Sequence, residues 1–442
     1  MKFKEIADIV LKASPAEQTE VVVNYQDASL TRFANNTIHQ NVTERNVQIG
    51  VRAVIGKRVG IANGNDARQE GLEQLVRTAY DLAKLSPENP EFPGLPSPKP
   101  VISINAFDQR TAECSPRDRA ERVGVVCRKA HSAGLMGAGS MRTVWSGWGV
   151  ANSNGVFAEC RTSMADITTV IMGENSSGWA QQSANRIDDI DIESIADEAV
   201  RKARIGANPV DYQPGEYSVV LDSYATANIL AMLALDGMSA MSFQEERSWL
   251  YGRIGQQVMA ESVTIADDGL DASGLPLPFD FEGMPKKRVA IVDRGVAESP
   301  VYDTLTAGRG KVETTGHAMP PSASERYGPL PMNLFLKTGA SSVDDMIRST
   351  KTGLYITRFW YTRPVHPRDA VITGMTRDGT YVIRDGEIAY PVKSLRFTQS
   401  YVEALKNVEL IGSTPRLQWE EFFTFSVPAI KIGQFRFTGS TR

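Results

Sequence analysis

Side chains that commonly bind a transition metal or assist hydrolysis are scarce in this chain. Its four histidines are His39, His131, His317 and His366. A zinc peptidase helix needs two histidines about one turn apart, with a glutamate as general base. No two histidines here lie within a helical turn of each other, and no HExxH, HExxxH or similar arrangement occurs. All three cysteines lie between residues 114 and 160, so a His/Cys zinc site confined to the second half of the chain is excluded.

Hydrolysis without a metal would require a nucleophile and a base brought together from distant parts of the chain. The GxSxG turn that exposes a nucleophilic serine is missing, as are a P-loop and a GxGxxG loop after a strand. His317 and His366 are the candidate bases of a metal-independent hydrolase. Nothing beside either histidine nominates a nucleophile, so the pattern favours loop histidines at both positions.

Two acidic clusters, residues 188–191 and Asp267-Asp268, could in principle bind a hard cation. The start of a helix explains the first cluster, because acids are favoured there by the helix dipole. A turn at the end of a strand explains the second. We therefore assign no metal ligand and no catalytic residue in this chain.

Composition excludes several classes of protein. The chain has 442 residues, with 48 basic and 52 acidic side chains, which is too acidic for binding through nucleic-acid phosphates. The densest basic run, residues 286–288, is expected to be a solvated strand entry. Acidic residues at positions 5 and 8 interrupt what would be the apolar core of a signal peptide, so we expect no secretory signal. No apolar stretch of about 18 residues occurs, so we expect no membrane span. The cysteines are few and odd in number, which indicates a reducing compartment, and we expect a cytoplasmic protein.

The first half of the chain mixes helices and strands. Expected helices are residues 3–12, a segment capped by Asp66 and ending near Leu82, residues 116–131 behind a Ser115 cap, and residues 192–203. Expected strands are a hairpin of residues 49–54 and 58–61, and residues 141–172 with a turn at 152–155. Six prolines between residues 87 and 100 predict an extended connector or surface wrap.

The second half begins with a strand at residues 217–221 and a helix from Ser223 to Met241, and is then mostly strands. Hairpins are expected across Arg294-Gly295 and Asp385-Gly386. The pattern predicts an α+β protein in which a mixed N-terminal domain precedes a β-rich C-terminal domain. The expected division is residues 1–85, a proline-rich connector at 86–100, residues 101–210 and residues 211–442.

Several segments, in this order and spacing, resemble the TldD/PmbA family. They cover nearly the whole chain and include residues 217–221, 248–258 (SWLYGRIGQQV), 263–268, 281–285 (FEGMP), 302–304, 315–318 (TGHA), 331–334, 353–357, 373–379 (TGMTRDG) and 385–388. In the first half, the turns at residues 152–155 and 208–209 are similar to turns of the family.

The resemblance implies a two-subunit peptidase of cytosolic type. One subunit carries a zinc-binding HExxxH helix and a distant cysteine, and the other, TldE (PmbA)-like, lacks them. The corresponding segment here, residues 231–237, reads AMLALDG and offers no histidine or cysteine. The resemblance therefore implies a metal-free subunit that completes a chamber for unfolded peptides, with zinc in an HExxxH-bearing partner.

From the resemblance alone, we expect seven residues to contact peptide: Ser248, Tyr302, Thr315, Gly316, Asn333, Gly374 and Arg377. The glycine-dotted strands around two of them would suit close approach of a peptide backbone, or simply tight turns. Two other functions stay open: a homodimer that binds peptides or proteins without cleaving them, and a metal-independent hydrolase built around His317 or His366.

Overall fold

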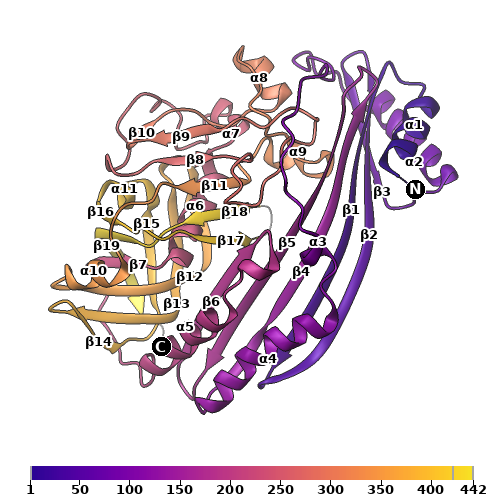
Figure 1. Cartoon of the computed structure of the whole chain (residues 1–442). Helices are drawn as coiled ribbons and strands as arrows, with labels where there is room; N and C mark the ends of the chain where they lie inside the picture. Colours follow the sequence, from indigo (N-terminus) through magenta and orange to yellow (C-terminus); the bar gives the residue numbers. More distant parts are fainter. Residues whose placement is uncertain (1, 421–422, 441–442) are drawn as a thin grey trace.

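The computed structural model of the chain describes residues 2–420 and 423–440. The described residues form eleven α-helices and three β-sheets (Figure 1). The first half supplies one sheet with its covering helices, and the second half supplies the other two sheets. The predicted α+β class, with a mixed N-terminal part before a β-rich C-terminal part, is confirmed.

The elements have the following bounds. The helices are α1 (Phe3–Ala13), α2 (Gln69–Leu85), α3 (Gln109–Ala112), α4 (Pro116–Ser132), α5 (Ile192–Ile205), α6 (Ser223–Gly237), α7 (Ala240–Gln244), α8 (Thr304–Gly310), α9 (Pro321–Tyr327), α10 (Val343–Arg348) and α11 (Tyr401–Lys406), with short 3-10 turns η1 (Ile187–Asp189) and η2 (Pro367–Asp369). The strands are β1 (Gln18–Ala34), β2 (Thr37–Ile55), β3 (Arg58–Gly64), β4 (Met136–Asn152), β5 (Phe157–Met172), β6 (Ser177–Ala184), β7 (Gly215–Leu221), β8 (Ile265–Asp267), β9 (Val289–Asp293), β10 (Val296–Ala297), β11 (Asn333–Leu336), β12 (Thr352–His366), β13 (Val371–Arg384), β14 (Glu387–Pro391), β15 (Leu395–Ser400), β16 (Val408–Ile411), β17 (Arg416–Glu420), β18 (Phe423–Val427) and β19 (Ile430–Ser440).

The first sheet is antiparallel and has the order β3-β2-β1-β4-β5-β6. Its long strands curve alongside the second half of the chain, and the helices α1 and α2 lie on the side away from it (Figure 1). The predicted hairpin β2–β3 and the turn between β4 and β5 are confirmed. The Ser115 cap of α4 is also confirmed, because its hydroxyl accepts from the Asp118 N–H and the Asp118 carboxylate accepts from the Ser115 N–H.

Successive side chains of a strand point to opposite faces of the sheet, and the apolar set determines which face packs against the helices. Odd-numbered apolar residues such as Val21, Val23 and Met141 pack into two clusters under α1 and α2, and under α4 and α5. Even-numbered residues point to the opposite face, which we call the groove face. On β1 these include Asn24 and Gln26, which are polar and uncharged.

The proline-rich segment between α2 and α3 wraps over the first sheet, as expected. Phe92 and Leu95 are buried in a small cluster with residues of the first hairpin. The Leu95 N–H donates to Gln18 Oε1 at 2.7 Å, and the Asn152 side-chain amide donates to the Pro96 carbonyl at 2.9 Å. Side chains of the sheet thus satisfy the extended backbone.

The second half is organised around α6. This helix is apolar on nearly all sides because it packs between the other two sheets, against β12 and β18. In the third sheet, pairings among β12, β7, β19, β15 and β13 close a ring of five strands. Phe359, Phe397 and Phe435 pack together there, with ring centroids 4.6–5.6 Å apart.

Two element boundaries differ from the predictions. Helix α2 begins after Arg68, which is extended, and the Asp66 carboxylate instead accepts from the Arg68 N–H and guanidinium. The helix predicted to reach Met241 ends at Gly237. An added Cβ at Gly237 would lie 2.3 Å from the Trp249 ring, so glycine permits close approach of that indole, which donates to the Leu233 carbonyl.

Two further predictions in the second half were wrong in part. The Arg294-Gly295 hairpin has a second strand of only two residues, β10. Lys286, expected in a solvated strand entry, is 3% exposed, and its ammonium finds no hydrogen-bond acceptor among the described residues. Burial lowers the pKa of this ammonium, and the carboxylates of Asp267 and Asp280 oppose that shift.

A buried ion cluster joins the first sheet to the second half. Arg52 on β2 lies 3.5 Å from Glu20 on β1 and 3.2 Å from Glu282, which belongs to the loop after β8. All three side chains are nearly inaccessible. Beside them, an apolar cluster brings Val22 and Val150 of the sheet against Phe281.

No described helix combines the length and apolar composition needed to cross a bilayer.

Candidate functional site

The groove face of the first sheet and loops of the second half enclose two cavities. Cavity A has a volume of about 640 Å³ and lies over the middle of β1, β4 and β5. Cavity B has a volume of about 1030 Å³ and lies over the part of these strands nearer to the β1–β2 turn. Both volumes suit a ligand of peptide or small-molecule size.

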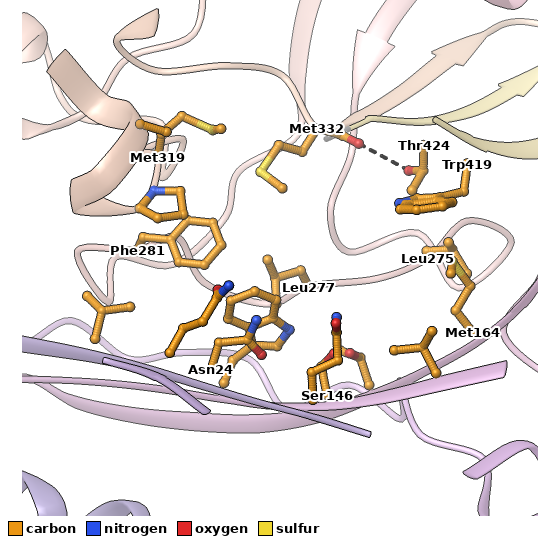
Figure 2. A pocket seen from close by; sticks show the side chains of 18 of the residues that line it. Asn24, Ser146, Met164, Leu275, Leu277, Phe281, Met319, Met332, Trp419 and Thr424 are labelled. Atoms are coloured by element: carbon orange, nitrogen blue, oxygen red, sulfur yellow. Dashed lines mark hydrogen bonds between the residues drawn. The ribbon is translucent and has the colours of Figure 1, made fainter. Parts of the chain in front are cut away.

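Cavity A is mostly apolar, with polar side chains and the cationic Arg142 on its floor. Figure 2 shows Asn24 and Ser146 rising from the sheet toward Met319 and Met332 of the opposing loops, with Phe281 beside them. No carboxylate is among the described residues that line it. Methionine side chains adapt to different apolar shapes, so this wall suits an uncharged side chain of variable form.

Cavity B is larger and carries charges of both signs. Its walls include Arg32, Glu44, Asp166, Arg358 and Arg363. The Asp166 carboxylate is engaged within the sheet, where it accepts hydrogen bonds from Ser183, Gln181 and Thr168 at 2.7–3.2 Å. Burial raises the pKa of Asp166, and those hydrogen bonds oppose the shift.

Helix α6 turns one face toward cavity B. Asn228, Ala231, Met232 and Leu235 line the cavity at the i, i+3, i+4, i+7 spacing of a single helix face. This face includes part of residues 231–237, where the resemblance placed the metal motif of the catalytic subunit type. An apolar helix thus forms the wall at that place.

Zinc does not fit the side chains at this place. It requires nitrogen, thiolate or carboxylate donors, and Ala231, Met232 and Leu235 provide none. The nearby carboxylate, Asp236, does not line the cavity; it is 7% exposed, and burial raises its pKa to about 6. Among the described residues, no group of three or more His, Cys, Asp and Glu side chains could hold a metal ion.

The two candidate bases are held in structural contacts. His317 is 1% exposed; its Nε2 lies 2.7 Å from Asp267 Oδ1, and its Nδ1 lies 2.9 Å from the Thr315 carbonyl. Burial is the main cause that lowers the pKa of His317. His366 is exposed and pairs with Asp369 at 3.1 Å. Both ring nitrogens of His317 are therefore occupied, and neither histidine lines cavity A or B.

Six of the seven expected peptide contacts lie in the walls of neither cavity. Ser248 is fully buried, and its hydroxyl donates to the Gly237 carbonyl. Tyr302 and Thr315 are brought together, because the Tyr302 N–H donates to Thr315 Oγ1 at 2.7 Å. Gly316 follows with φ +74°, a conformation that favours glycine.

The other three are dispersed. Asn333 lines cavity A, and its side-chain amide donates to the Leu275 carbonyl at 2.8 Å. Gly374 is buried in β13, where an added Cβ would lie 2.8 Å from the Phe397 ring. Arg377 is half-exposed, with its guanidinium over the Trp360 ring. The structure thus brings together only Tyr302, Thr315 and Gly316.

Sequence reasoning missed the groove residues themselves. Arg142 lines both cavities and lies at their junction, with its guanidinium carbon 5.0 Å from the centre of the Trp419 ring. A signal was present in the strands, since polar residues recur at even positions of β1 and β4. What covers that face depends on residues more than 200 positions later, such as Trp419, which no local pattern reveals.

Three family models match the chain, and together they span most of it. The PmbA/TldA metallopeptidase C-terminal domain matches residues 214–439, domain 1 matches residues 19–83, and the central domain matches residues 106–206. The first of these covers slightly more than half of the 442 residues.

Individual relatives agree with these matches. A protein named metalloprotease TldD homolog from Haemophilus influenzae is 25% identical over 397 residues, covering 84% of this chain and 80% of the relative. A protein named metalloprotease PmbA from Escherichia coli O157:H7 is 21% identical over 384 residues, covering 83% and 80%. The crystal structure of TldE from Thermococcus kodakarensis has the same fold, with a TM-score of 0.90 at 19% identity over 99% of both chains.

Proposed function

The chain belongs to the PmbA/TldD metallopeptidase family, and from this premise we propose that it is the metal-free, non-catalytic subunit of a heterodimeric metallopeptidase. The observation that carries the proposal is the composition of the α6 face that lines cavity B. Where the resemblance places the metal motif, this chain presents Ala231, Met232 and Leu235, which offer no zinc ligand and no general base.

In this proposal the chain shapes the chamber and holds substrate, while an HExxxH-bearing partner supplies zinc and the general base. Cavities A and B would receive a segment of an unfolded polypeptide, because they combine apolar walls with hydrogen-bonding side chains on a sheet face. Among the residues expected from the resemblance, Asn333 in cavity A and Arg377 on the third sheet remain our proposed peptide contacts. A cytoplasmic location belongs to the same proposal.

A second function is favoured by one observation. In both cavities the first sheet and the second half of the same chain supply opposite walls, so a homodimer of this chain could bind peptide without cleaving it. A metal-independent hydrolase based on His317 is not proposed, because both ring nitrogens of that residue already have partners.

Reconstitution tests the proposal. The chain is purified alone, and also after co-expression with an HExxxH-bearing relative, and each sample is assayed for bound zinc and for cleavage of an unfolded protein. The matched control is the same pair with glutamine in place of the HExxxH glutamate. We expect zinc in both pairs but not in the chain alone, and cleavage in the intact pair only. The control pair should assemble without cleaving, because it keeps the zinc-binding histidines and lacks the general base. Chelator-resistant cleavage by the chain alone would overturn the proposal.

A further inference from the structure

The junction between cavities A and B contains an arginine, Arg142. It is partly buried on β4, and among the described residues Asp166 and Glu44 act on its guanidinium through charge, without a hydrogen bond to it. Withdrawing a guanidinium from water without replacing its hydrogen bonds is unfavourable. Arg142 therefore lies at a position where a bound anion would be stabilised.

The position of this guanidinium is well defined by its surroundings. It lies over the Trp419 ring. The backbone N–H of Trp419 donates to Ser183 Oγ at 2.9 Å, and the backbone carbonyl of Trp419 accepts from the Gln181 side chain at 3.1 Å. Strand β17 is thus fixed against β6 of the first sheet. A stacked arginine keeps its edge of N–H donors available for a planar acceptor such as a carboxylate.

The charge around Arg142 limits the kind of anion. Asp166 is its cross-strand neighbour, and Glu44 also lies close enough to interact with it electrostatically. Two nearby carboxylates disfavour a doubly charged phosphate, whereas a single carboxylate fits a single guanidinium. Burial is the main cause that lowers the pKa of Arg142, and both acids oppose the shift.

Cavity A begins beside this arginine and suits an apolar group. Trp419, Met164 and Leu275 gather at one end of the cavity, with Leu277 farther along it (Figure 2). A ligand bound at the junction would therefore carry a carboxylate and an adjacent uncharged, apolar side chain. A peptide that ends in an apolar residue has this combination.

Resting on the proposed function for peptide as the ligand class, we propose that Arg142 binds a carboxylate of the peptide while cavity A receives the neighbouring apolar side chain. The carboxylate can come from the peptide C-terminus or from an aspartate or glutamate within the peptide. Arg142 would set specificity and orientation in the groove.

Binding to the isolated full-length chain tests this inference. The probes are a fluorescein-labelled pentapeptide ending in leucine, as the free acid and as the C-terminal amide, and a third peptide with a glutamate before an amidated leucine. Fluorescence anisotropy is expected to show the free acid binding at least tenfold tighter than the amide. A similar gain for the glutamate peptide would assign the site to internal carboxylates, and none would assign it to the C-terminus.

Variants separate the proposed role from general damage to the groove. R142Q is expected to abolish the preference for the free acid while binding the amide as before, and R142K is expected to restore part of it. R77Q is the matched control, because Arg77 is an exposed arginine on α2 that lines neither cavity; it should keep the preference. Circular dichroism confirms that each variant is folded.

The inference is overturned if neither carboxylate-bearing peptide binds tighter than the plain amide, if no peptide binds at millimolar concentration, or if the preference survives R142Q. Its failure is distinct from failure of the proposed function. Cleavage by the reconstituted pair without any carboxylate preference would remove only this inference. Carboxylate preference with an inert pair would remove only the peptidase-subunit role.

Discussion

The buried glutamate between the first sheet and the second half should give this protein a measurable pH dependence of stability. Glu20 is 1% exposed, and neither of its side-chain oxygens accepts a hydrogen bond from a described residue. Burial raises its pKa from 4.5 to about 7; Arg52 opposes this shift, while Glu282 and Asp280 add to it. The perturbation is Glu20→Gln, which keeps the shape and removes the charge at every pH.

The sign follows from proton binding. Between pH 4.5 and 7 the folded state holds a proton on Glu20 that the unfolded state has released, so stability falls as the pH rises through this window. Each unit of difference between the folded-state and unfolded-state pKa changes the free energy of unfolding by about 1.4 kcal/mol. The fall attributable to Glu20 is therefore about 3 kcal/mol in total, of which roughly 2.5 kcal/mol lies between pH 5 and pH 8.

Urea unfolding at pH 5 and pH 8 measures this effect. The free energy of unfolding of E20Q, relative to the original chain, is expected to rise by roughly 2.5 kcal/mol from pH 5 to pH 8. Glu70→Gln is the matched control, because Glu70 is an exposed glutamate on α2, and its profile should follow that of the original chain. Parallel profiles for E20Q and the original chain would refute the assignment of this titration to Glu20.

Three further substitutions test the packing by urea unfolding at pH 7. Lys202→Met should lower the free energy of unfolding by about 3–5 kcal/mol, because the buried ammonium bonds Asp222 at 2.7 Å and its removal leaves that carboxylate buried without this cation. A decrease below about 1 kcal/mol would contradict this reasoning. Gly60→Ala should cost about 3 kcal/mol, since the new methyl would lie 2.2 Å from backbone atoms of α2. Gly64→Ala, whose methyl meets only the Leu75 side chain at 3.3 Å, is its control, and equal losses would contradict the account. Phe397→Ala should cost about 3–5 kcal/mol through the aromatic cluster of the third sheet, and a loss near zero would show that the cavity closes without cost.

Local patterns predicted most elements of the first half. In the Ser115 cap and in the turn at residues 152–155, side chains bond backbone groups within four positions along the sequence. Local sequence therefore determines their geometry. The alternation of strands β1 and β4 was also visible. Helix α2 was misjudged at its start because Asp66 contacts the Arg68 guanidinium instead of capping the helix.

Long-range contacts limited the prediction of the second half and of the site. The helix expected to reach Met241 ends where Trp249 packs on Gly237, and Lys286 is buried beside Asp267 and Asp280. The cavities depend on loops that approach the sheet from residues 275–332 and on Trp419. The family resemblance identified the apolar segment of α6, but it could not show that this segment faces a cavity shared with Arg142.

The central claim is that this chain completes a metallopeptidase without supplying its metal site. The most direct test measures zinc content and cleavage of an unfolded protein for the chain alone, for an HExxxH-bearing relative alone, and for the co-expressed pair. The account predicts stable assembly of the pair, with one zinc site assigned to the relative and cleavage that chelators abolish. Stoichiometric zinc or proteolysis in the chain alone would contradict it.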